Sequence, residues 1–540
     1  MTKTRRKLLI FSPYSGIWQH QLQQTQFMTK YDFSAYDISV VSCGGLLNRH
    51  CAVYESFGYK YNQKEQDQIC RKCINSSRLT TASLKVEETK LGDFLTDEEK
   101  SNRIEILDSI KTSELGNFSF AGLEIARLTA FETFIKYKKT DFQLSKEEEQ
   151  HWRNGIYQGL VVQIAAERII DAVQPDLVLA YSPQYAATSV FAEICQLNGV
   201  PLYFLEGSIH LGERYKALHL WNWERHGLVD PAIELYEQTV CTIQNKSETK
   251  RIYEHLKITE QARSFGAYSQ KKSRKYDLFS DFKIADGKKV VLCALSSTDE
   301  IYSGFVIGKI PLERYRGRVF HTQYEWIKET IRIAEKYNDI FFIIRIHPRM
   351  VSNKREDFDS PEVNKWRDLL AVLPENMAVD YPEDKRSISN YFAQIDLLIT
   401  GWSSTAIDAM AVGVPAISCD ESLSWFPKRV VYACKSVTDY ELTILMKLKN
   451  GKNSGNRKLA FDWLGFRLLN GTISVSGRLI DRLKLNNWRL IELVYAFATK
   501  YLFGLLVRLE LALIPKKKEK IPYPVQQVLD GDETSLFHSR

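Results

Sequence analysis

Two short polar segments of this chain contain side chains suited to binding an anion. The first is Arg345-Ile346-His347-Pro348-Arg349, which directly follows the apolar run at 341–344. Two guanidinium groups and an imidazole can bind a phosphate or a diphosphate through charge-assisted hydrogen bonds. Pro348 favours an extended backbone at His347, the residue before it. The alternative to anion binding is that Arg345 only forms an ion pair with a nearby carboxylate of the protein.

The second segment is Ser403-Ser404-Thr405, which precedes an apolar stretch at 406–412. A helix over that stretch would place its free N-terminal N–H groups beside the hydroxyls, and together they would form a neutral anion site. The following Gly413-Val414-Pro415 is typical of a helix end. An ordinary Ser/Thr helix cap is the alternative for this segment alone. Because both segments follow predicted strands, we expect them to meet at one edge of a sheet.

Three residues in the first half of the chain are candidates for a general base. Glu206 follows the apolar run at 202–205, His210 comes shortly after it, and His20 follows a loop that contains Ser15 and Gly16. A carboxylate or an imidazole that accepts a proton from a reacting hydroxyl contributes roughly 10²- to 10⁴-fold in rate. A surface carboxylate and ordinary core histidines are the alternatives.

Four cysteines lie near one another in the sequence: Cys43, Cys51, Cys70 and Cys73. The Cys-x-x-Cys pair is a typical half-site for structural zinc, because it presents two thiolates to a tetrahedral ion. Unligated thiols, an iron–sulfur cluster and a redox pair are the alternatives. The remaining cysteines have apolar neighbours, and we expect them in the core: Cys195, Cys241, Cys293, Cys419 and Cys434.

Parallel strands are needed to bring the polar segments together, and the hydrophobic pattern predicts them. Strands are expected at 7–11, 38–41, 176–180, 202–205, 290–295, 340–346, 395–400 and 415–418, and the main helices at 160–173, 186–197 and 325–336. Strands that alternate with helices at this spacing indicate parallel, doubly wound sheets. The predicted fold class is therefore α/β, with two Rossmann-like doubly wound domains.

The predicted domains have the following bounds. Residues 1–275 form the first Rossmann-like domain, with the cysteine cluster and a helical insertion at about 62–158. Residues 276–470 form the second domain, and a polar stretch at 247–288 is the expected linker. Residues 471–540 form an amphipathic, basic tail.

The tail contains an aromatic, charge-interrupted segment at 487–514, followed by Lys516-Lys517-Lys518-Glu519-Lys520. This pattern is typical of an amphipathic helix that lies on an anionic membrane surface. A helix that packs against a domain is the alternative.

Composition limits the classes of protein to which this chain can belong. The chain has 540 residues, of which 44% are hydrophobic and 26% charged, and a formal net charge of +7. These values are typical of a globular protein with two or three domains, and the charge is too small to indicate nucleic-acid binding. The basic start has too short an apolar run for a signal peptide, and no window holds about 18 uncharged apolar residues. We therefore expect a cytoplasmic location.

The two polar segments carry a family resemblance over about residues 285–425. Arg-Ile-His-Pro-Arg, followed by Thr400-Gly401-Trp402-Ser403-Ser404-Thr405, resembles the C-terminal domain of bacterial capsule and surface-polysaccharide glycosyltransferases. More distantly it is similar to sialyltransferases and Kdo transferases of the GT-B fold. The helix opening at 320–327 resembles the capsule group too, in which paired N-terminal cysteines also occur. The resemblance implies that His347-Pro348 contacts a donor nucleotide and that Ser403-Ser404-Thr405 contacts its phosphate.

The expected function is therefore an inverting glycosyltransferase of GT-B architecture, with a nucleotide-sugar donor and a glycan or lipid-linked acceptor. Cys419-Asp420-Glu421 does not match the ribose-binding Glu of many UDP-sugar enzymes, which favours a CMP-linked donor. No Asp-x-Asp pair is placed to carry Mg²⁺, so no catalytic metal is expected. A peripheral position at the inner face of the plasma membrane is a further expectation for this cytoplasmic protein. A CDP-polyol phosphotransferase and a non-catalytic membrane-associated scaffold are the alternatives.

Overall fold

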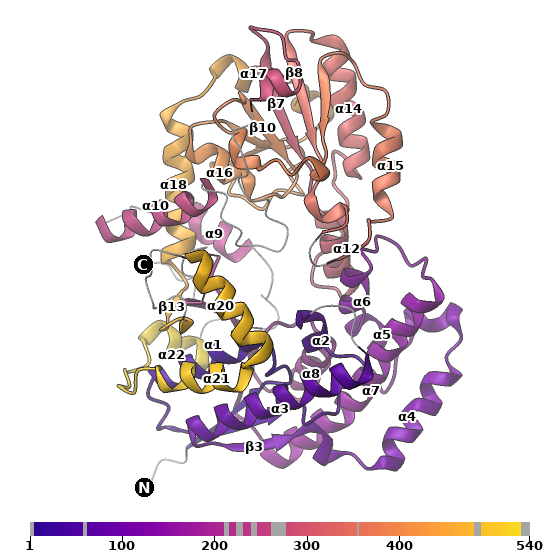
Figure 1. Cartoon of the computed structure of the whole chain (residues 1–540), viewed down its shortest axis with the longest axis vertical. Helices are drawn as coiled ribbons and strands as arrows, with labels where there is room; N and C mark the ends of the chain where they lie inside the picture. The colour runs from indigo at the N-terminus through magenta and orange to yellow at the C-terminus, as the bar shows by residue number, and fades with distance from the viewer. Residues whose placement is uncertain are drawn as a thin grey trace.

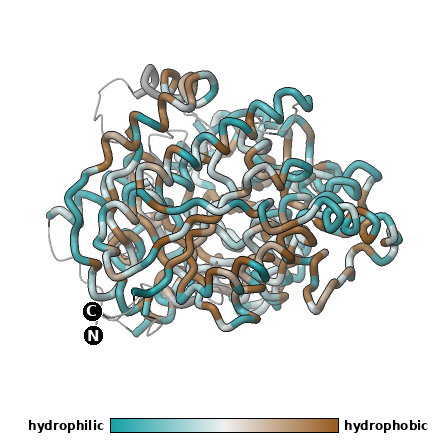
Figure 2. The backbone as a smooth tube through the Cα atoms, turned by 90° about the horizontal axis from the view of Figure 1, so that it is seen from below, coloured by the Kyte–Doolittle hydropathy of each residue, from teal (hydrophilic) through white to brown (hydrophobic). Residues whose placement is uncertain are grey.

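The computed structural model describes residues 5–57, 62–209, 215–222, 230–238, 246–260, 277–353, 356–479 and 488–530. The chain forms two α/β units, each built around a mainly parallel sheet (Figure 1). In Figure 2, apolar stretches run through the middle of the molecule, and hydrophilic stretches predominate along much of its outline. Within the described ranges, none of the helices combines the length and the hydropathy that crossing a bilayer requires.

The first sheet has seven strands in the order β13-β6-β5-β4-β1-β2-β3. Its strands are β1 (Arg6–Phe11), β2 (Tyr36–Ser42), β3 (Glu87–Lys90), β4 (Leu177–Ala180), β5 (Leu202–Gly207), β6 (Ala217–Asn222) and β13 (Ile473–Ser474). The five adjacent strands β3, β2, β1, β4 and β5 are parallel. Strand β6 is antiparallel to β5, and β13 is antiparallel to β6. The strand order reverses between β1 and β4, and ligands of such sheets bind beyond the carboxyl ends at this switch point.

The second sheet has six strands, all parallel, in the order β12-β11-β10-β7-β8-β9. They are β7 (Lys289–Ala294), β8 (Ile340–Arg345), β9 (Met377–Asp380), β10 (Leu397–Thr400), β11 (Ala416–Ser418) and β12 (Tyr432–Ala433). Alternate residues of β7 enter two different cores, with Val290 and Leu292 on one face and Val291 and Cys293 on the other. Because both faces are covered, the strands are continuous apolar runs. The switch point lies between β7 and β10.

The helices of the first unit include the predicted insertion. They are α1 (Trp18–Lys30), α2 (Ala52–Phe57), α3 (Gln63–Leu84), α4 (Asp97–Ser109), α5 (Ile125–Leu128), α6 (Phe131–Lys136), α7 (Lys146–Val173) and α8 (Ala186–Leu197), with the short helices η1 (Leu91–Phe94) and η2 (Thr112–Asn117). Capping boxes begin α3, α4 and α7, where Asn62, Thr96 and Ser145 each pair with a Glu three residues later. The insertion is mainly helical, as predicted, but β3 within it adds a strand to the sheet.

The helices around the second sheet come from the middle of the chain. They are α9 (Asp230–Gln238), α10 (Lys246–Glu260), α11 (Leu278–Asp281), α12 (Thr298–Val306), α13 (Leu312–Tyr315), α14 (Gln323–Lys336), α15 (Glu362–Leu369), α16 (Thr405–Ala411), α17 (Val437–Asn450) and α18 (Ser454–Leu469), with η3 (Pro348–Met350), η4 (Pro382–Asp384) and η5 (Ile388–Asn390). Helix α10 lies in the stretch predicted as a linker, and it packs against α16 and α18. Helix α10 thus belongs to the second unit.

The C-terminal part of the chain returns to the first unit. Strand β13 pairs with β6, and the helices α20 (Trp488–Tyr501), α21 (Phe503–Ala512) and α22 (Tyr523–Asp530) follow (Figure 1). Phe503 and Val507 of α21 share a small core with Trp18 and Leu22 of α1. One face of the predicted amphipathic segment is therefore a packing surface.

Candidate functional site at the facing sheet edges

The carboxyl edges of the two sheets face the same interface, where α6 of the first unit meets α12 of the second (Figure 1). Helix α12 follows β7, and its Tyr302 lies in the hydrophobic core of the first unit. Helix α8 follows β4, and its first residue, Ala186, donates its N–H to Glu132 Oε1 of α6 at 2.8 Å. Helix α6 therefore touches the elements that leave the carboxyl ends of both sheets.

Hydroxyl groups gather at the switch point of the second sheet. Thr400, the last residue of β10, donates its Oγ1 hydroxyl to Ala294 O of β7 at 3.1 Å and accepts the N–H of Ser403 at 3.2 Å. The Ser403 and Thr405 hydroxyls lie 2.9 Å apart, and Ser404 is exposed. The three predicted residues are thus held at the switch point, where hydroxyl and N–H groups can donate to an anion.

His347 lies at the end of the neighbouring strand, β8, and is half-buried. Its Nδ1 accepts the N–H of Arg349 at 3.3 Å. Burial, and then the charges of Arg349 and Arg345, lower the pKa of His347 to about 3. The imidazole is therefore neutral at pH 7, and since Nδ1 accepts a hydrogen bond, Nε2 carries the proton. The neutral ring can therefore donate a hydrogen bond from Nε2.

Arg345 has a carboxylate partner inside the protein. Its guanidinium forms an ion pair with Asp380, donates to Arg386 O at 2.7 Å, and lies 5.4 Å from the ring centre of Tyr391. This is the alternative that the sequence left open for Arg345. A contact between Arg345 and a donor stays a prediction.

Arg349 is buried, with 1% of its surface exposed. Its Nε lies 2.6 Å from Asp299 Oδ2, its Nη1 lies 2.8 Å from Glu356 Oε1, and its Nη2 donates to Ile135 O of α6. Beside it, Lys138 Nζ donates to Val351 O at 3.1 Å and to Phe358 O at 2.7 Å. Arg349 thus connects the turn after β8 to α12 and to the first unit, and its binding to a donor stays a prediction.

The loop after β7 was missed by the sequence-based reasoning, although it lies opposite Ser403 across the switch point. Gln323 accepts the N–H of Ser296 at 2.9 Å and donates to Ser296 O and to Thr298 Oγ1, both at 3.0 Å. The Ser296 hydroxyl is buried and has no hydrogen-bond partner within the described ranges. The missed signal is Ser296-Ser297-Thr298, a strand–hydroxyl–helix sequence like the one at 400–405.

In the first unit, His20 of α1 lies at the switch point. Its ring stacks on Tyr181, which follows β4, with ring centres 3.5 Å apart and an interplanar angle of 18°. Ser182, the next residue, has a φ of 41°, which is uncommon for a residue with a side chain. Such strained residues cluster at functional sites. The structure thus places His20 beside the loops of β1 and β4.

Glu206 lies at the carboxyl end of β5, one strand beyond β4, and is half-buried opposite His219 of β6. Nδ1 of His219 lies 2.8 Å from Gly471 O. Burial and the charge of Arg467 lower the pKa of His219 to about 4. The third predicted base, His210, lies outside the described residues. The roles of Glu206, His20 and His210 stay predictions.

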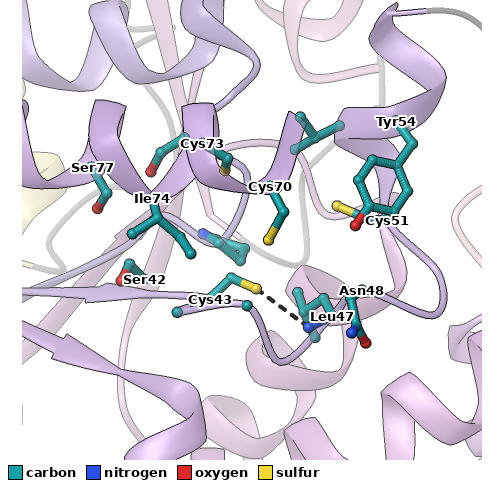
Figure 3. Close-up of a pocket in the computed structure, with 15 residues that line it drawn as sticks. Ser42, Cys43, Leu47, Asn48, Cys51, Tyr54, Cys70, Cys73, Ile74 and Ser77 are labelled. Carbon is teal, nitrogen blue, oxygen red and sulfur yellow. Dashed lines mark hydrogen bonds between the residues drawn. The ribbon is translucent and has the colours of Figure 1, made fainter. Parts of the chain in front are cut away.

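The four clustered cysteines come together around one cavity (Figure 3). Among the residues that the structure describes, no group of three or more His, Cys, Asp or Glu side chains has an arrangement that could hold a metal ion. Cys195, Cys293, Cys419 and Cys434 are buried, as predicted, and Cys241 lies outside the described residues.

Comparison with known proteins gives matches only among solved structures, because no family model and no curated protein matches this chain. The UDP-GlcNAc 2-epimerase from Neisseria meningitidis bound to UDP-GlcNAc is 10% identical, covers 84% of this chain and 94% of its own, and has a TM-score of 0.27. The Thermosulfurimonas dismutans KpsC β-Kdo 2,4 transferase is 12% identical, covers 53% and 79%, and has a TM-score of 0.30. The calicheamicin glycosyltransferase CalG4 is 9% identical, covers 92% and 100%, and has a TM-score of 0.27. The two doubly wound sheets of this chain confirm the fold class that the sequence predicted.

Proposed function

We propose that this protein is a glycosyltransferase that binds a nucleotide sugar at the second sheet and an acceptor at the first. The observation that carries the proposal is that the carboxyl edges of the two sheets face each other, and that hydroxyl groups lie at the switch point of one of them. A two-substrate reaction needs both reactants held in fixed mutual positions, and two facing sites meet that requirement.

On the donor side, the hydroxyls of Ser403 and Thr405 bind the phosphate nearest the sugar, with Ser404 at the exposed position beside them. His347 donates Nε2–H to the same group, because its Nδ1 already accepts the N–H of Arg349. Donors that are held in place before the reaction stabilise charge as it develops on the leaving phosphate. The proposed reaction is a single, inverting displacement that needs no divalent metal.

On the acceptor side, we favour His20 as the general base over Glu206 and His210. His20 is fixed by stacking on Tyr181 at the switch point of its sheet, whereas Glu206 lies one strand farther along. An imidazole in this position can accept the proton of a sugar hydroxyl. The leaving group departs from the sugar carbon as the acceptor oxygen attacks from the opposite side.

The proposed donor is a CMP-linked sugar. Asp420, which stands near the position of the ribose-binding Glu in UDP-sugar enzymes, is buried and accepts the N–H groups of Val319 at 2.6 Å and Phe320 at 3.0 Å. Its carboxylate is therefore engaged in holding the loop before α14. This engagement supports a donor that does not need a carboxylate at this position.

We also propose that the outer face of α20 and α21 binds an anionic membrane surface, which would bring the enzyme to a lipid-linked acceptor. Large apolar side chains along both helices, and directly after each of them, are exposed: Leu493, Val494, Phe497, Tyr501, Leu502, Leu505, Leu509 and Leu513. Exposed cations lie on the same helices and just after them: Lys500, Arg508, Lys516, Lys517, Lys518 and Lys520. An apolar stripe flanked by lysines matches the acyl boundary and the anionic headgroups of one leaflet.

Donor binding is the direct test of the proposed function. Thermal unfolding of the full chain is measured with CMP-, UDP-, GDP- and CDP-linked sugars, without and with EDTA. We expect one donor class to raise Tm in both conditions, and slow hydrolysis of that donor. The double variant Ser403→Ala/Thr405→Val should lose most of the shift, while Thr96→Ala, which removes an exposed helix cap far from the site, should keep it. The absence of any shift across the panel would refute the catalytic proposal, and a shift that EDTA abolishes would refute metal independence.

A further inference from the structure

Four thiols from three separate segments of the chain line one cavity in the first unit (Figure 3). Cys43 directly follows β2, and Cys51 directly precedes α2. Cys70 and Cys73 lie on α3 three residues apart, a spacing that places both on the same face of the helix. The fold thus brings together residues that are separated by a loop and a helix in the sequence.

The remaining lining of this cavity carries no charged side chain among the described residues. Besides the cysteines it consists of Pro13, Ser15, Ser42, Gly44, Gly45, Leu47, Asn48, Val53, Tyr54, Ile74 and Ser77. Cys51 is close enough to Cys43, Cys70 and Cys73 for electrostatic interaction with each of them. The four cysteine sulfurs are therefore the strong metal ligands of this described lining.

Backbone N–H groups are directed at the sulfurs. Leu47 N donates to Cys43 Sγ at 3.3 Å, and Gly16 N donates to Cys73 Sγ at 3.0 Å. Gly44 and Gly45, with φ of 61° and 98°, turn the chain directly after Cys43 in a way that residues with side chains rarely adopt. Backbone hydrogen bonds to sulfur of this kind are typical outer contacts of the thiolate ligands of metals.

We propose that Cys43, Cys51, Cys70 and Cys73 together bind a thiophilic metal centre through four thiolates. Since no metal-binding arrangement is present among the described residues, a single zinc ion requires the cysteines to change rotamer until each sulfur lies about 2.3 Å from the ion. An iron–sulfur cluster is also held by four thiolates and spans a wider space. The shared chemistry is tetrathiolate ligation, and metal content distinguishes the two sources.

The centre would fix the loop after β1. Gly16 lies in that loop, and a Cβ at Gly16 would lie 2.6 Å from Val53 Cγ1 and 3.0 Å from Cys73 Cβ, so this loop packs tightly against the cysteine-bearing elements. The same loop leads into α1, which carries His20. A metal centre here would therefore stabilise the acceptor side of the proposed enzyme without taking part in the reaction.

The test is the metal content of the full chain, purified without chelator and without oxygen. We expect about one zinc per chain, or about two to four irons per chain with visible absorption. Cys70→Ser/Cys73→Ser should lose the metal, whereas the matched control Cys195→Ala, which removes a buried thiol elsewhere, should keep it. Less than about 0.2 of either metal per wild-type chain, or full metal content in the double variant, would overturn the proposal.

A second measurement does not depend on how the variants fold. Wild-type protein is stripped of metal and titrated with Co²⁺, and cobalt–thiolate absorption should rise to a plateau at one equivalent if the four sulfurs bind one ion. If the purified protein contains iron, reconstitution with iron and sulfide replaces this titration. Failure to bind cobalt and failure to reconstitute would together overturn the proposal. Both readouts are independent of donor binding, so they separate this inference from the proposed function.

Discussion

Arg349 and Asp299 form a buried ion pair, with Nε of Arg349 2.6 Å from Oδ2 of Asp299, that joins the turn after β8 to the helix after β7. The same guanidinium pairs with Glu356 and donates to Ile135 O of the first unit. A residue expected to bind a phosphate therefore holds together two strand ends and the interface between the units. This pair positions the turn after β8, and it also positions His347, because Arg349 N donates to His347 Nδ1.

Replacing Arg349 by Met should destabilise the protein strongly. The substitution removes the guanidinium that pairs with two buried carboxylates, Asp299 and Glu356, and breaking a buried ion pair in this way costs about 3–5 kcal/mol. Urea unfolding measures the change. The control Arg332→Met removes an exposed arginine that pairs with Glu329 and Glu441, and it should cost no more than about 1 kcal/mol. An Arg349→Met variant that is as stable as wild type but binds the donor more weakly would contradict this prediction and indicate that Arg349 binds the donor.

The sequence predicted the strands whose side chains are buried on both faces. The apolar runs at 290–295 and 340–346 became β7 and β8, within a residue or two at each end. Strand β3 was not predicted, because Glu87-Glu88-Thr89-Lys90 contains no apolar residue and its position comes from pairing with β2. Strand β13 has only two residues, and it exists because the C-terminal chain returns to β6. Edge strands of this kind are specified by tertiary contacts and carry no local pattern.

The candidate site was predictable in part, for a similar reason. His347 and Ser403 could be placed at strand ends, since a polar residue after an apolar run is visible in the sequence. The partners of Arg349 could not be predicted, because nothing in the sequence distinguishes Asp299 and Glu356 from other acidic residues. Only the folded turn and the packing of α12 beside it bring them to Arg349. The stacking of His20 on Tyr181 likewise depends on the adjacency of β1 and β4.

His219 should make stability depend on pH in the acidic range. Its pKa is about 4 in the folded chain, mainly because of burial, against about 6.5 when unfolded. Between these values the unfolded chain binds a proton that the folded chain does not, so this contribution to stability is present above about pH 6.5 and is lost as pH falls toward about 4. The slope is at most about 1.4 kcal/mol per pH unit. In His219→Gln, urea unfolding across this range should show a slope reduced by that amount.

A second non-titrating substitution separates charge from shape at this position. His219→Asn should flatten the pH dependence as His219→Gln does, even if the two variants differ in stability at neutral pH through the contact with Gly471 O. Identical slopes in wild type and both variants would contradict the prediction.

Ser296 offers a test with opposite signs for stability and for binding. Its buried hydroxyl has no partner within the described ranges, so Ser296→Ala should raise the free energy of unfolding by about 1 kcal/mol in the absence of a donor. The control Ser418→Ala removes a buried hydroxyl that donates to Gly401 O and Asp420 O, both at 2.9 Å, and it should lower that free energy by about 1 kcal/mol. If Ser296 contacts the donor, its Ala variant should also show a smaller donor-induced rise in Tm. A Ser296→Ala variant destabilised as much as Ser418→Ala would contradict the prediction.

Charges placed on the outer face of α21 should prevent membrane binding without unfolding the protein. Leu505 and Leu509 are 55% and 47% exposed, while the opposite face of the same helix packs against α1 and α3 through Phe503 and Val507. Leu505→Glu/Leu509→Glu therefore disturbs little packing but adds two anions to the surface that we propose faces anionic headgroups, where each unit charge contributes about 1 kcal/mol. We expect co-sedimentation with vesicles rich in anionic lipid to fall at least tenfold, and the free energy of urea unfolding to stay within about 1 kcal/mol of wild type.

Val372→Glu, at a residue that is 87% exposed and lies in the second unit, is the matched control and should sediment like wild type. Equal sedimentation of all three proteins would show that this face does not bind membranes, and binding that is equal on neutral and anionic vesicles would remove the role of the lysines that follow α21.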